Sequence, residues 1–238
     1  MDELLLAWFR EHGRDLPWRR TRDPYAILVS EVMLQQTQVA RVVPRWTEWL
    51  ERWPTAGALA AASPGEVIVA WQGLGYNRRA LSLHRAAQVV AERGWPDDLT
   101  ELPGVGRYTA DAVRAFAFAE PVLPIETNVR RVQERTEHAF GHACGQALMD
   151  LGATVCLARV PRCGACPLAG ACRSRGRRYE PRRRQSRFEG SFRQRRAAAL
   201  SVVAAGPAPR ATLDAAAVAS LAADGLVEIA GGVVRLPQ

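Results

Sequence analysis

Apolar residues recur every three or four positions along the first two thirds of the chain. The pattern is clearest in 25–40, 66–71 and 80–91, where it predicts helices. Prolines separate these segments at intervals that suit short helices. They are Pro24, Pro44, Pro54, Pro64, Pro96 and Pro103. Because no run there alternates between apolar and polar residues, we expect 1–155 to be mostly helical, with the last helix ending near Val155.

The pattern changes after residue 190. Segments 193–203 and 212–224 keep helical spacing, and two short β-prone runs then flank a pair of glycines, which predicts a β-hairpin. The two runs are 226–229 and 233–236. Two helices and a hairpin within 191–238 are typical of a small winged-helix-like module. Such a module could bind DNA or only pack against the rest of the chain, and the pattern does not decide between the two.

The basic charge of the chain is concentrated in one stretch. Residues 173–196 hold eleven arginines and two acidic residues, a net +9, whereas the whole chain of 238 residues carries +8. A near-neutral body with one basic stretch favours a polyanionic partner, although a solvated linker would have the same composition. We therefore place an Arg-rich linker at 173–190, between a catalytic region at 1–172 and the C-terminal module.

The chain shows neither a membrane-spanning segment nor the layout of a secretory signal. No run approaches about eighteen apolar residues, and the first helix has no basic-then-apolar leader. We expect a cytoplasmic, reducing location near the bacterial nucleoid, no membrane partner, and a monomer. All 32 basic residues are arginine. No lysine can form a Schiff base, so only the N-terminal amine is left for such chemistry.

Four cysteines stand together in 156–172, with the spacing C-x6-C-x2-C-x5-C. They are Cys156, Cys163, Cys166 and Cys172. Four thiolates in one loop can close around a single metal centre, and the tight, irregular spacing favours a cubane iron–sulfur cluster. A zinc ion and a disulfide pair are the alternatives, but zinc sites more often use two separated C-x2-C pairs. Cys144 stands apart and is interpreted as a small buried apolar residue.

The string LPGVGRYTA at 102–110 combines a turn-forming proline with two glycines directly before a predicted helix. Backbone N–H groups at such a helix start suit a phosphate, and the helix dipole assists them. Between two apolar helices, this string is typical of a helix-hairpin-helix, which would hold a DNA backbone without reading its sequence.

Two further strings place acidic residues where they could do chemistry. SEVMLQQTQ at 30–38 sets Glu31 among apolar residues and ahead of three glutamines. Glutamine can probe base edges or fill the gap that an extruded base leaves. IETNVRRV at 125–132 sets Glu126 at a helix start that a basic turn follows.

Together these strings resemble the helix-hairpin-helix DNA glycosylase superfamily with an iron–sulfur cluster, and within it the MutY-type adenine DNA glycosylases. The resemblance covers 1–172 and includes the strings LPW, WQGLGY, LHRAA and QALMDLGA. It implies a mostly α, endonuclease III-like fold with a six-helix barrel domain and a cluster-bearing helical domain. In bifunctional relatives the Schiff-base lysine follows the hairpin arginine. Here that residue is Tyr108, so the resemblance implies a monofunctional glycosylase.

The resemblance also implies a role for each matching residue. Glu31 would protonate the departing base, with its apolar neighbours holding its pKa high, while Glu126 would stay ionised and stabilise the oxocarbenium-like sugar. Tyr108 and Asn128 would orient the sugar and the carboxylate. The expected DNA contacts are Gln35, Gln36, Tyr76, Leu102, Gly104, Val105, Gly106, Arg107 and Thr109. The expected base pocket is Trp18, Arg19 and Asp150, the cluster ligands are Cys156, Cys163, Cys166 and Cys172, and arginines 159, 162 and 173 would face phosphates.

Three features depart from the family. Glu126 stands where the family usually has aspartate. Only thirteen residues, 133–145, lie between Val132 and Gln146, an interval in which relatives carry one or two further helices. We therefore expect a helix at 127–140 that leads almost directly into the cluster-bearing helix. The 48 residues after Gly190 are too few for the Nudix-like domain with which many relatives recognise 8-oxoguanine.

Three functional hypotheses follow. The first is hydrolysis of the N-glycosidic bond of a flipped-out adenine that is mispaired with 8-oxoguanine or guanine in double-stranded DNA. The second is the same chemistry on hypoxanthine, uracil or a mismatched thymine. The third is a non-catalytic iron–sulfur DNA-binding protein, against which the presence of Glu31 argues.

Overall fold

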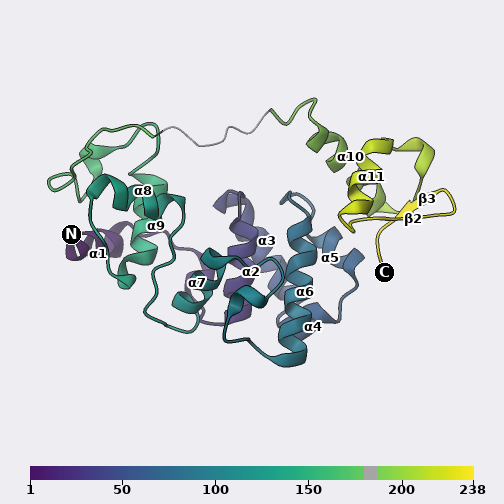
Figure 1. Ribbon diagram of the computed structural model, residues 1–238, viewed down its shortest axis with the longest axis horizontal. Coiled ribbons are helices and arrows are strands. Elements are labelled where there is room, and N and C mark those ends of the chain that lie inside the picture. The colour runs from purple at the N-terminus through teal and green to yellow at the C-terminus, as the bar shows by residue number, and fades with distance from the viewer. Residues whose placement is uncertain (180–186) are drawn as a thin grey trace. The chain divides into compact units, whose positions relative to one another are not determined.

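The computed structural model describes every residue except 180–186, so this part of the expected Arg-rich linker lies outside the described residues (Figure 1). The described elements are mostly helices, which confirms the expected fold class. Among them, no helix is long and apolar enough to cross a membrane. The chain forms two compact units: Met1–Ile27 with Gly106–Arg184, and Leu28–Val105 with Gln185–Gln238.

The first unit is built on two helices that pack along each other, α8 and α9 (Figure 1). Its helices are α1 (Asp2–His12), α7 (Arg107–Phe116), α8 (Thr127–Thr136) and α9 (Gly145–Thr154). Leu5 of α1, Val132 of α8 and Leu148 of α9 belong to one buried cluster, in which Cys144 also lies, as expected for a small apolar residue. The cysteine loop follows α9 directly, as the sequence predicts.

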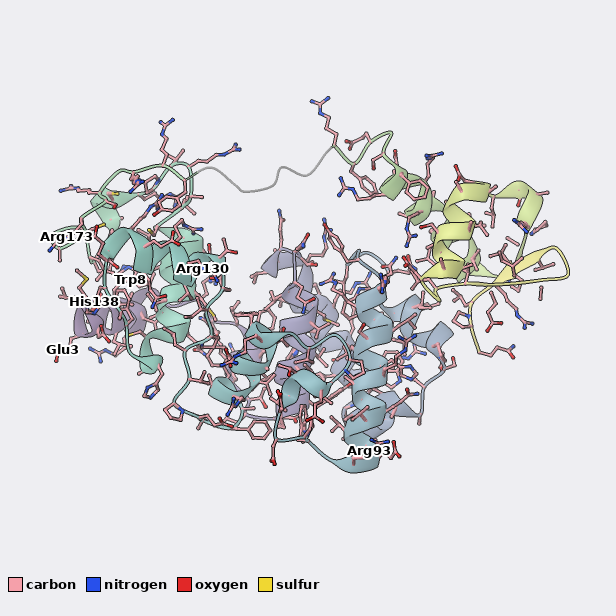
Figure 2. The ribbon with its side chains drawn as sticks, viewed as in Figure 1. Glu3, Trp8, Arg93, Arg130, His138 and Arg173 are labelled. Atoms are coloured by element: carbon pink, nitrogen blue, oxygen red, sulfur yellow. The ribbon has the colours of Figure 1, made fainter. Side chains whose placement is uncertain are left out.

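The expected helix at 127–140 is wrong at its end, because α8 stops at Thr136. Glu137 then adopts a left-handed backbone conformation, with φ at 51°, and turns the chain away. The next residues are held by Asp2: its carboxylate accepts the backbone N–H of Gly141 at 2.9 Å and lies 2.8 Å from Nε2 of His138 (Figure 2). After this tether to α1, one 3₁₀ turn (His142–Cys144) leads directly into α9.

The second unit contains α3 (Val39–Arg52), α4 (Ala56–Ala60), α5 (Pro64–Ala70) and α6 (Arg78–Arg93). Helix α2 (Pro24–Leu34) runs across the division between the units. The expectation of continuous helix over 25–40 is wrong at 35–38, where a loop separates α2 from α3 and Gln36 has a φ of 56°. The apolar spacing continues across this loop, so periodicity alone could not detect it.

The C-terminal segment packs against the helices of the second unit. Its elements are α10 (Phe192–Ala205), β1 (Ala208–Pro209), α11 (Ala215–Ala223), β2 (Glu228–Ala230) and β3 (Val233–Arg235). The predicted helices and hairpin are confirmed, and the strand order is β1-β3-β2. Strand β1 escaped prediction because it is two residues long and includes a proline. Leu200 and Val218 of this C-terminal module share a buried cluster with Ile68 of α5 and Leu81 of α6, so packing, one of the two expected uses, is present.

Candidate functional site

Glu31 lies in the middle of α2, a helix whose residues from Tyr25 to Met33 are all buried. The exposed fraction of Glu31 is 6%. Burying a carboxyl group costs several kcal/mol unless other groups compensate, so such a residue on an otherwise apolar helix needs a reason. A catalytic acid in a dry environment is one such reason, and it matches the role that the sequence predicts for Glu31.

The end of α2 and both neighbouring loops are held by one guanidinium, that of Arg79 on α6. Its Nη1 donates to the backbone carbonyls of Val32 at 2.7 Å, Met33 at 3.0 Å and Gln35 at 2.6 Å. Its Nη2 donates to Thr37 Oγ1 at 3.1 Å and to the carbonyls of Leu74 at 3.3 Å and Gly75 at 2.8 Å. Burial lowers the pKa of Arg79 to about 10, so the guanidinium remains charged at neutral pH.

These hydrogen bonds fix the two loops that carry three of the expected DNA contacts, Gln35, Gln36 and Tyr76. Gln36 and Tyr76 both have positive φ angles, of 56° and 49°, which is uncommon for residues other than glycine. Gln35 precedes the first of these positions, and its carbonyl is bound directly by Arg79. The guanidinium of Arg79 also lies over the ring of Tyr76, 5.6 Å from its centroid. Arg79 therefore holds both loops in conformations that would otherwise be disfavoured.

Replacing Arg79 by lysine is expected to slow base excision about tenfold to a hundredfold, because an ammonium cannot reach six acceptors on two loops and leaves buried carbonyls unsatisfied. Single-turnover excision and the fluorescence of 2-aminopurine beside the target base would measure the loss. Arg85→Lys, an exposed change on the same helix, is the matched control. Equal rates for the two variants would contradict the role of Arg79.

The hairpin at 102–110 has the backbone that its glycines predict. Gly104 has a φ of 79°, and a Cβ there would lie 2.5 Å from Cβ of Ser82 on α6, so only glycine fits. Gly106 caps α7 without a side-chain hydrogen bond, so the first turn is open to an anion. Arg107 is exposed, whereas the expected contacts Leu102, Val105 and Thr109 are buried. At those three positions only the backbone could meet DNA.

Glu126 is the N-cap of α8, where its Oε1 accepts the backbone N–H of Val129 at 3.0 Å. Its longer side chain therefore still caps the helix as an aspartate would. Two residues on, Asn128 Oδ1 accepts from Nη2 of Arg131 at 2.6 Å, and Arg131 also donates to the carbonyls of Gly152 at 2.7 Å and Cys156 at 2.8 Å. The start of α8 is thus tied to α9 and to the first cysteine.

Gly152→Ala is expected to destabilise the first unit. A Cβ at residue 152 would lie 2.5 Å from Cβ of Asn128, so α8 and α9 would have to separate. Overpacking of this kind costs about 1–3 kcal/mol, which corresponds to a Tm lower by roughly 2–12 °C for a chain of this size. Thermal unfolding measures it, with Gly57→Ala as control because a Cβ there meets only an ordinary contact. An unchanged Tm for Gly152→Ala would contradict the close packing.

Asp150 on α9 has an exposed fraction of 0% and is bound by two arginines. Arg14 donates from Nη2 to Oδ1 at 2.6 Å and from its backbone N–H to Oδ2 at 2.8 Å. Arg19 donates from Nη2 to Oδ1 at 2.7 Å and from Nη1 to Oδ2 at 2.9 Å. Burial alone would raise the pKa of Asp150, but the hydrogen bonds from Arg19 and Arg14 outweigh it and hold the pKa below its usual value.

Trp18 and Arg19 line a cavity of about 230 Å³ in the first unit, together with Thr21, Arg22, Ala115, Phe116 and Gln146. This volume lies below the roughly 300–1,000 Å³ of pockets for drug-sized ligands, which suits something as small as a nucleobase. Asp150 does not line the cavity, and both of its oxygens are engaged by arginines. Of the three residues expected in the base pocket, Trp18 and Arg19 therefore line the cavity. Asp150 lies outside the cavity and fixes the guanidinium of Arg19 through two hydrogen bonds.

The expected catalytic residues are shared between the two units. The first unit holds Tyr108 in the first turn of α7, Glu126 and Asn128 at the start of α8, and the cavity beside Trp18 and Arg19. The second unit holds Glu31 together with Gln35, Gln36 and Tyr76.

All four predicted cysteine ligands line one small cavity in the first unit. They are Cys156, Cys163, Cys166 and Cys172, and all are free thiols, which disagrees with the disulfide alternative. Burial raises the pKa of Cys166, and the other three thiols raise it further, as expected for sulfurs that lie near one another. Within the described part of the chain, however, no three His, Cys, Asp or Glu side chains approach closely enough to form a metal site.

The sequence did not single out Arg135, whose guanidinium lies beneath the cysteine loop with an exposed fraction of 2%. Its Nη1 lies 3.1 Å from Sγ of Cys156, and its Nη2 donates to the carbonyls of Ala158 at 2.8 Å and Arg177 at 2.6 Å. It also lies 4.8 Å from the ring centroid of Tyr179. The available signal was its position on the buried face of α8, three residues after Val132.

The remaining expectations concern the surroundings of these sites. Arg159, Arg162 and Arg173 are all exposed, and Nε of Arg173 lies 3.7 Å from a carboxylate oxygen of Glu137 (Figure 2). Trp71 is fully buried. His84 is buried too, and burial lowers its pKa, so this ring stays neutral and is a poor candidate for proton transfer at neutral pH.

The chain is similar in sequence to known DNA repair proteins. The family described as "HhH-GPD superfamily base excision DNA repair protein" matches residues 29–141. The adenine DNA glycosylase of Mycolicibacterium smegmatis is 44% identical over 268 aligned positions, which cover 94% of this chain and 91% of that protein. The adenine DNA glycosylase of Homo sapiens is 40% identical over 212 aligned positions, which cover 73% of this chain and 39% of that protein.

Solved structures share the fold. A thermostable thymine-DNA glycosylase matches with a TM-score of 0.66 at 27% identity, covering 72% of this chain and 93% of that one. A trapped endonuclease III–DNA intermediate matches with a TM-score of 0.62 at 23% identity, covering 72% and 92%. The mycobacterial alignment, at 268 positions, is longer than this chain of 238 residues, so that relative contains residues that this chain lacks.

Proposed function

Since this chain belongs to the adenine DNA glycosylase family of the HhH-GPD base excision DNA repair superfamily, we propose that it hydrolyses the N-glycosidic bond of adenine in double-stranded DNA. The adenine would be mispaired with 8-oxoguanine or guanine and flipped out of the duplex. The observation that carries the proposal is the buried carboxyl of Glu31 within a chain that matches these enzymes over almost its whole length. We expect the protein to act as a monomer near the nucleoid.

In the proposed mechanism Glu31 protonates the departing adenine. In this proposal the carboxyl of Glu31 enters the reaction protonated, because only that form can donate a proton to the base. Positive charge then develops on the sugar as the bond breaks. The carboxylate of Glu126, whose Oε1 accepts the N–H of Val129 at the start of α8, stabilises that charge. Water completes the hydrolysis, with Glu31 accepting its proton.

The same proposal includes a monofunctional enzyme, one that removes the base and does not cut the strand. Strand cleavage through a Schiff base needs an amine on the enzyme, and the chain has no lysine. Tyr108, which follows the hairpin arginine, would orient the sugar instead. Borohydride added during turnover should therefore trap no covalent protein–DNA complex. A trapped complex would contradict this part of the proposal unless it mapped to the N-terminal amine.

We also propose that the four cysteines hold a [4Fe-4S] cluster. The donor set supports it: four free thiols line one cavity, and N–H groups from Arg135 and Gly176 point at the sulfurs of Cys156 and Cys163, at 3.1 and 3.3 Å. Such N–H donors stabilise thiolate sulfur. The bound cluster would cross-link the loop. Iron and sulfide analysis of anaerobically purified protein tests this, and a stoichiometric zinc content would overturn it.

The direct test of the proposed function is strand scission after alkali. The protein would be incubated with a duplex that carries one adenine opposite 8-oxoguanine and then heated with alkali, which breaks the strand only at an abasic site. We expect a product at the adenine with alkali and none without it. No product on any duplex, together with tight duplex binding, would favour the non-catalytic hypothesis.

A second substrate class has two observations in its favour. Glu126 is one methylene longer than the aspartate that the family usually carries, and a thymine-DNA glycosylase is among the matching structures. The same chemistry on a mismatched thymine, uracil or hypoxanthine is the alternative. Duplexes with these bases belong in the same assay.

A further inference from the structure

One cavity of the second unit has a volume of about 620 Å³. It is lined by the C-terminal module and by the two loops that carry Gln36 and Tyr76. From the loops come Gln35, Gln36 and Tyr76, from the module come Arg193 and Arg196, and Phe188 lies in the linker directly before the module. The volume lies within the range of ligand-binding pockets, which is roughly 300–1,000 Å³. Neither the packing of the module nor the expected action of the loops alone explains why the two should enclose a groove.

The groove has a net positive charge. Its lining includes Arg41, Arg78, Arg79, Arg193 and Arg196, against one acidic residue, Asp224. That acid is already engaged: Oδ2 of Asp224 lies 2.5 Å from Nη2 of Arg196, and Oδ1 lies 3.7 Å from Nη1 of Arg78. A concave surface with an excess of arginine attracts a polyanion.

Two exposed aromatic side chains face the same groove from its two walls. Tyr76 belongs to the loop before α6 and has an exposed fraction of 44%, and Phe188 precedes α10 with 47%. Exposed apolar side chains that gather at one concave surface mark binding sites more often than single ones do. Aromatic side chains next to cationic ones are the combination that binds nucleic acid strands, because bases stack on the rings while phosphates meet the cations.

The module is fixed firmly enough to act as a wall. Leu200, Val218 and Leu221 pack in one buried cluster with Ile68 of α5 and Leu81 of α6. Near the start of α5, a Cβ on Gly65 would lie 2.7 Å from the carbonyl oxygen of Pro237, so the C-terminal residues pack directly on that helix. Asp224 adds an electrostatic bridge between α10 and the first turn of α6. These contacts hold Arg193 at a set position relative to Tyr76.

We propose that the C-terminal module is a second wall of the DNA-binding site, and that the groove takes the sugar–phosphate backbone of a DNA strand. Arg193 from the module and Arg41 from α3 contact phosphates, and Phe188 faces a sugar or base. The inference rests on the proposed function in assigning the polyanion as DNA. It assigns to the short C-terminal module a binding role in addition to its packing role.

The test compares Arg193→Ala with Arg195→Ala in the full-length protein. Both variants remove one positive charge from α10, but Arg195 is exposed, lies 3.0 Å from Asp214 within the module and does not line the groove. Binding to a duplex without any target base would be measured over a range of salt concentrations. For Arg193→Ala we expect about three- to tenfold weaker binding and a salt slope reduced by about one phosphate contact. Arg195→Ala should match the unmodified protein.

Arg193→Lys provides the confirming arm, because lysine keeps the charge for a phosphate and should restore the salt slope. Identical affinities and slopes for Arg193→Ala and Arg195→Ala would overturn the inference and leave the module with packing alone. The duplex contains no target base, so a protein that excised nothing could still give the expected result. Conversely, an active adenine glycosylase could fail this test, so the two failures are distinguishable.

Discussion

Glu31→Gln is expected to abolish adenine excision while leaving DNA binding and folding intact. Glutamine has nearly the same shape and fits the buried site on α2, but it has no acidic proton to give to the leaving base. Loss of general acid catalysis alone costs about a hundredfold to ten-thousandfold. Because Glu31 is also expected to handle the attacking water, we expect a loss at or beyond the upper end of that range. Single-turnover excision with excess enzyme measures it.

Two controls separate chemistry from folding in this experiment. The Tm of Glu31→Gln should stay close to that of the unmodified protein, since glutamine has nearly the same shape as glutamate and can still form hydrogen bonds. Duplex affinity should change by less than about twofold, because Glu31 carries no phosphate contact in this account. A variant that retains the full excision rate would remove Glu31 from the mechanism.

Asp150→Asn is expected to lower the stability of the first unit by about 3–5 kcal/mol, because it leaves the guanidinium groups of Arg14 and Arg19 without their buried counter-charge. This corresponds to a Tm lower by roughly 10 °C. Excision should fall as well, since Arg19 would no longer be held at the cavity beside Trp18. The control is Asp15→Asn, which removes an exposed pair with Arg20 and should leave the Tm unchanged.

The effect of Asp150 should depend on pH in a definite direction. The hydrogen bonds from Arg19 and Arg14 hold its folded-state pKa below the unfolded value of about 3.9. A carboxyl of this kind contributes its full stability above the unfolded pKa and loses it as the pH falls through the folded pKa. The Tm difference between the two proteins should therefore be constant from about pH 8 to 5 and shrink below about pH 4. A difference that grew on acidification would contradict the ion pairs.

Local patterns were sufficient for much of the fold and for part of the site. Gly104 specifies the hairpin because its position has a positive φ and no room for a Cβ, and a glycine directly before a predicted helix is visible in the sequence. The helical spacing located α5, α6, α10 and α11 within two or three residues. The string around Glu31 indicated a buried carboxyl because the residues on both sides of it are apolar.

The features that escaped prediction depend on contacts between distant residues. Arg79 holds carbonyls that lie more than forty positions earlier in the chain, and no spacing rule distinguishes it from the neighbouring Arg78. No spacing rule distinguishes Arg135 from the other arginines of its helix either, yet its guanidinium lies under the cysteine loop. Asp150 was assigned to a base pocket, whereas only the structure shows that its oxygens are used by two arginines.

The identity of the excised base decides between the proposed adenine glycosylase and the alternative substrates. A single panel of duplexes settles it, each with one candidate base: adenine opposite 8-oxoguanine, guanine or thymine, and thymine, uracil or hypoxanthine opposite guanine. Excision would be followed under single-turnover conditions by alkaline strand cleavage. We predict fast release of adenine opposite 8-oxoguanine and guanine, and no release of adenine paired with thymine or of the other three bases. Preferential release of thymine, uracil or hypoxanthine, with the adenine mispairs left intact, would contradict it.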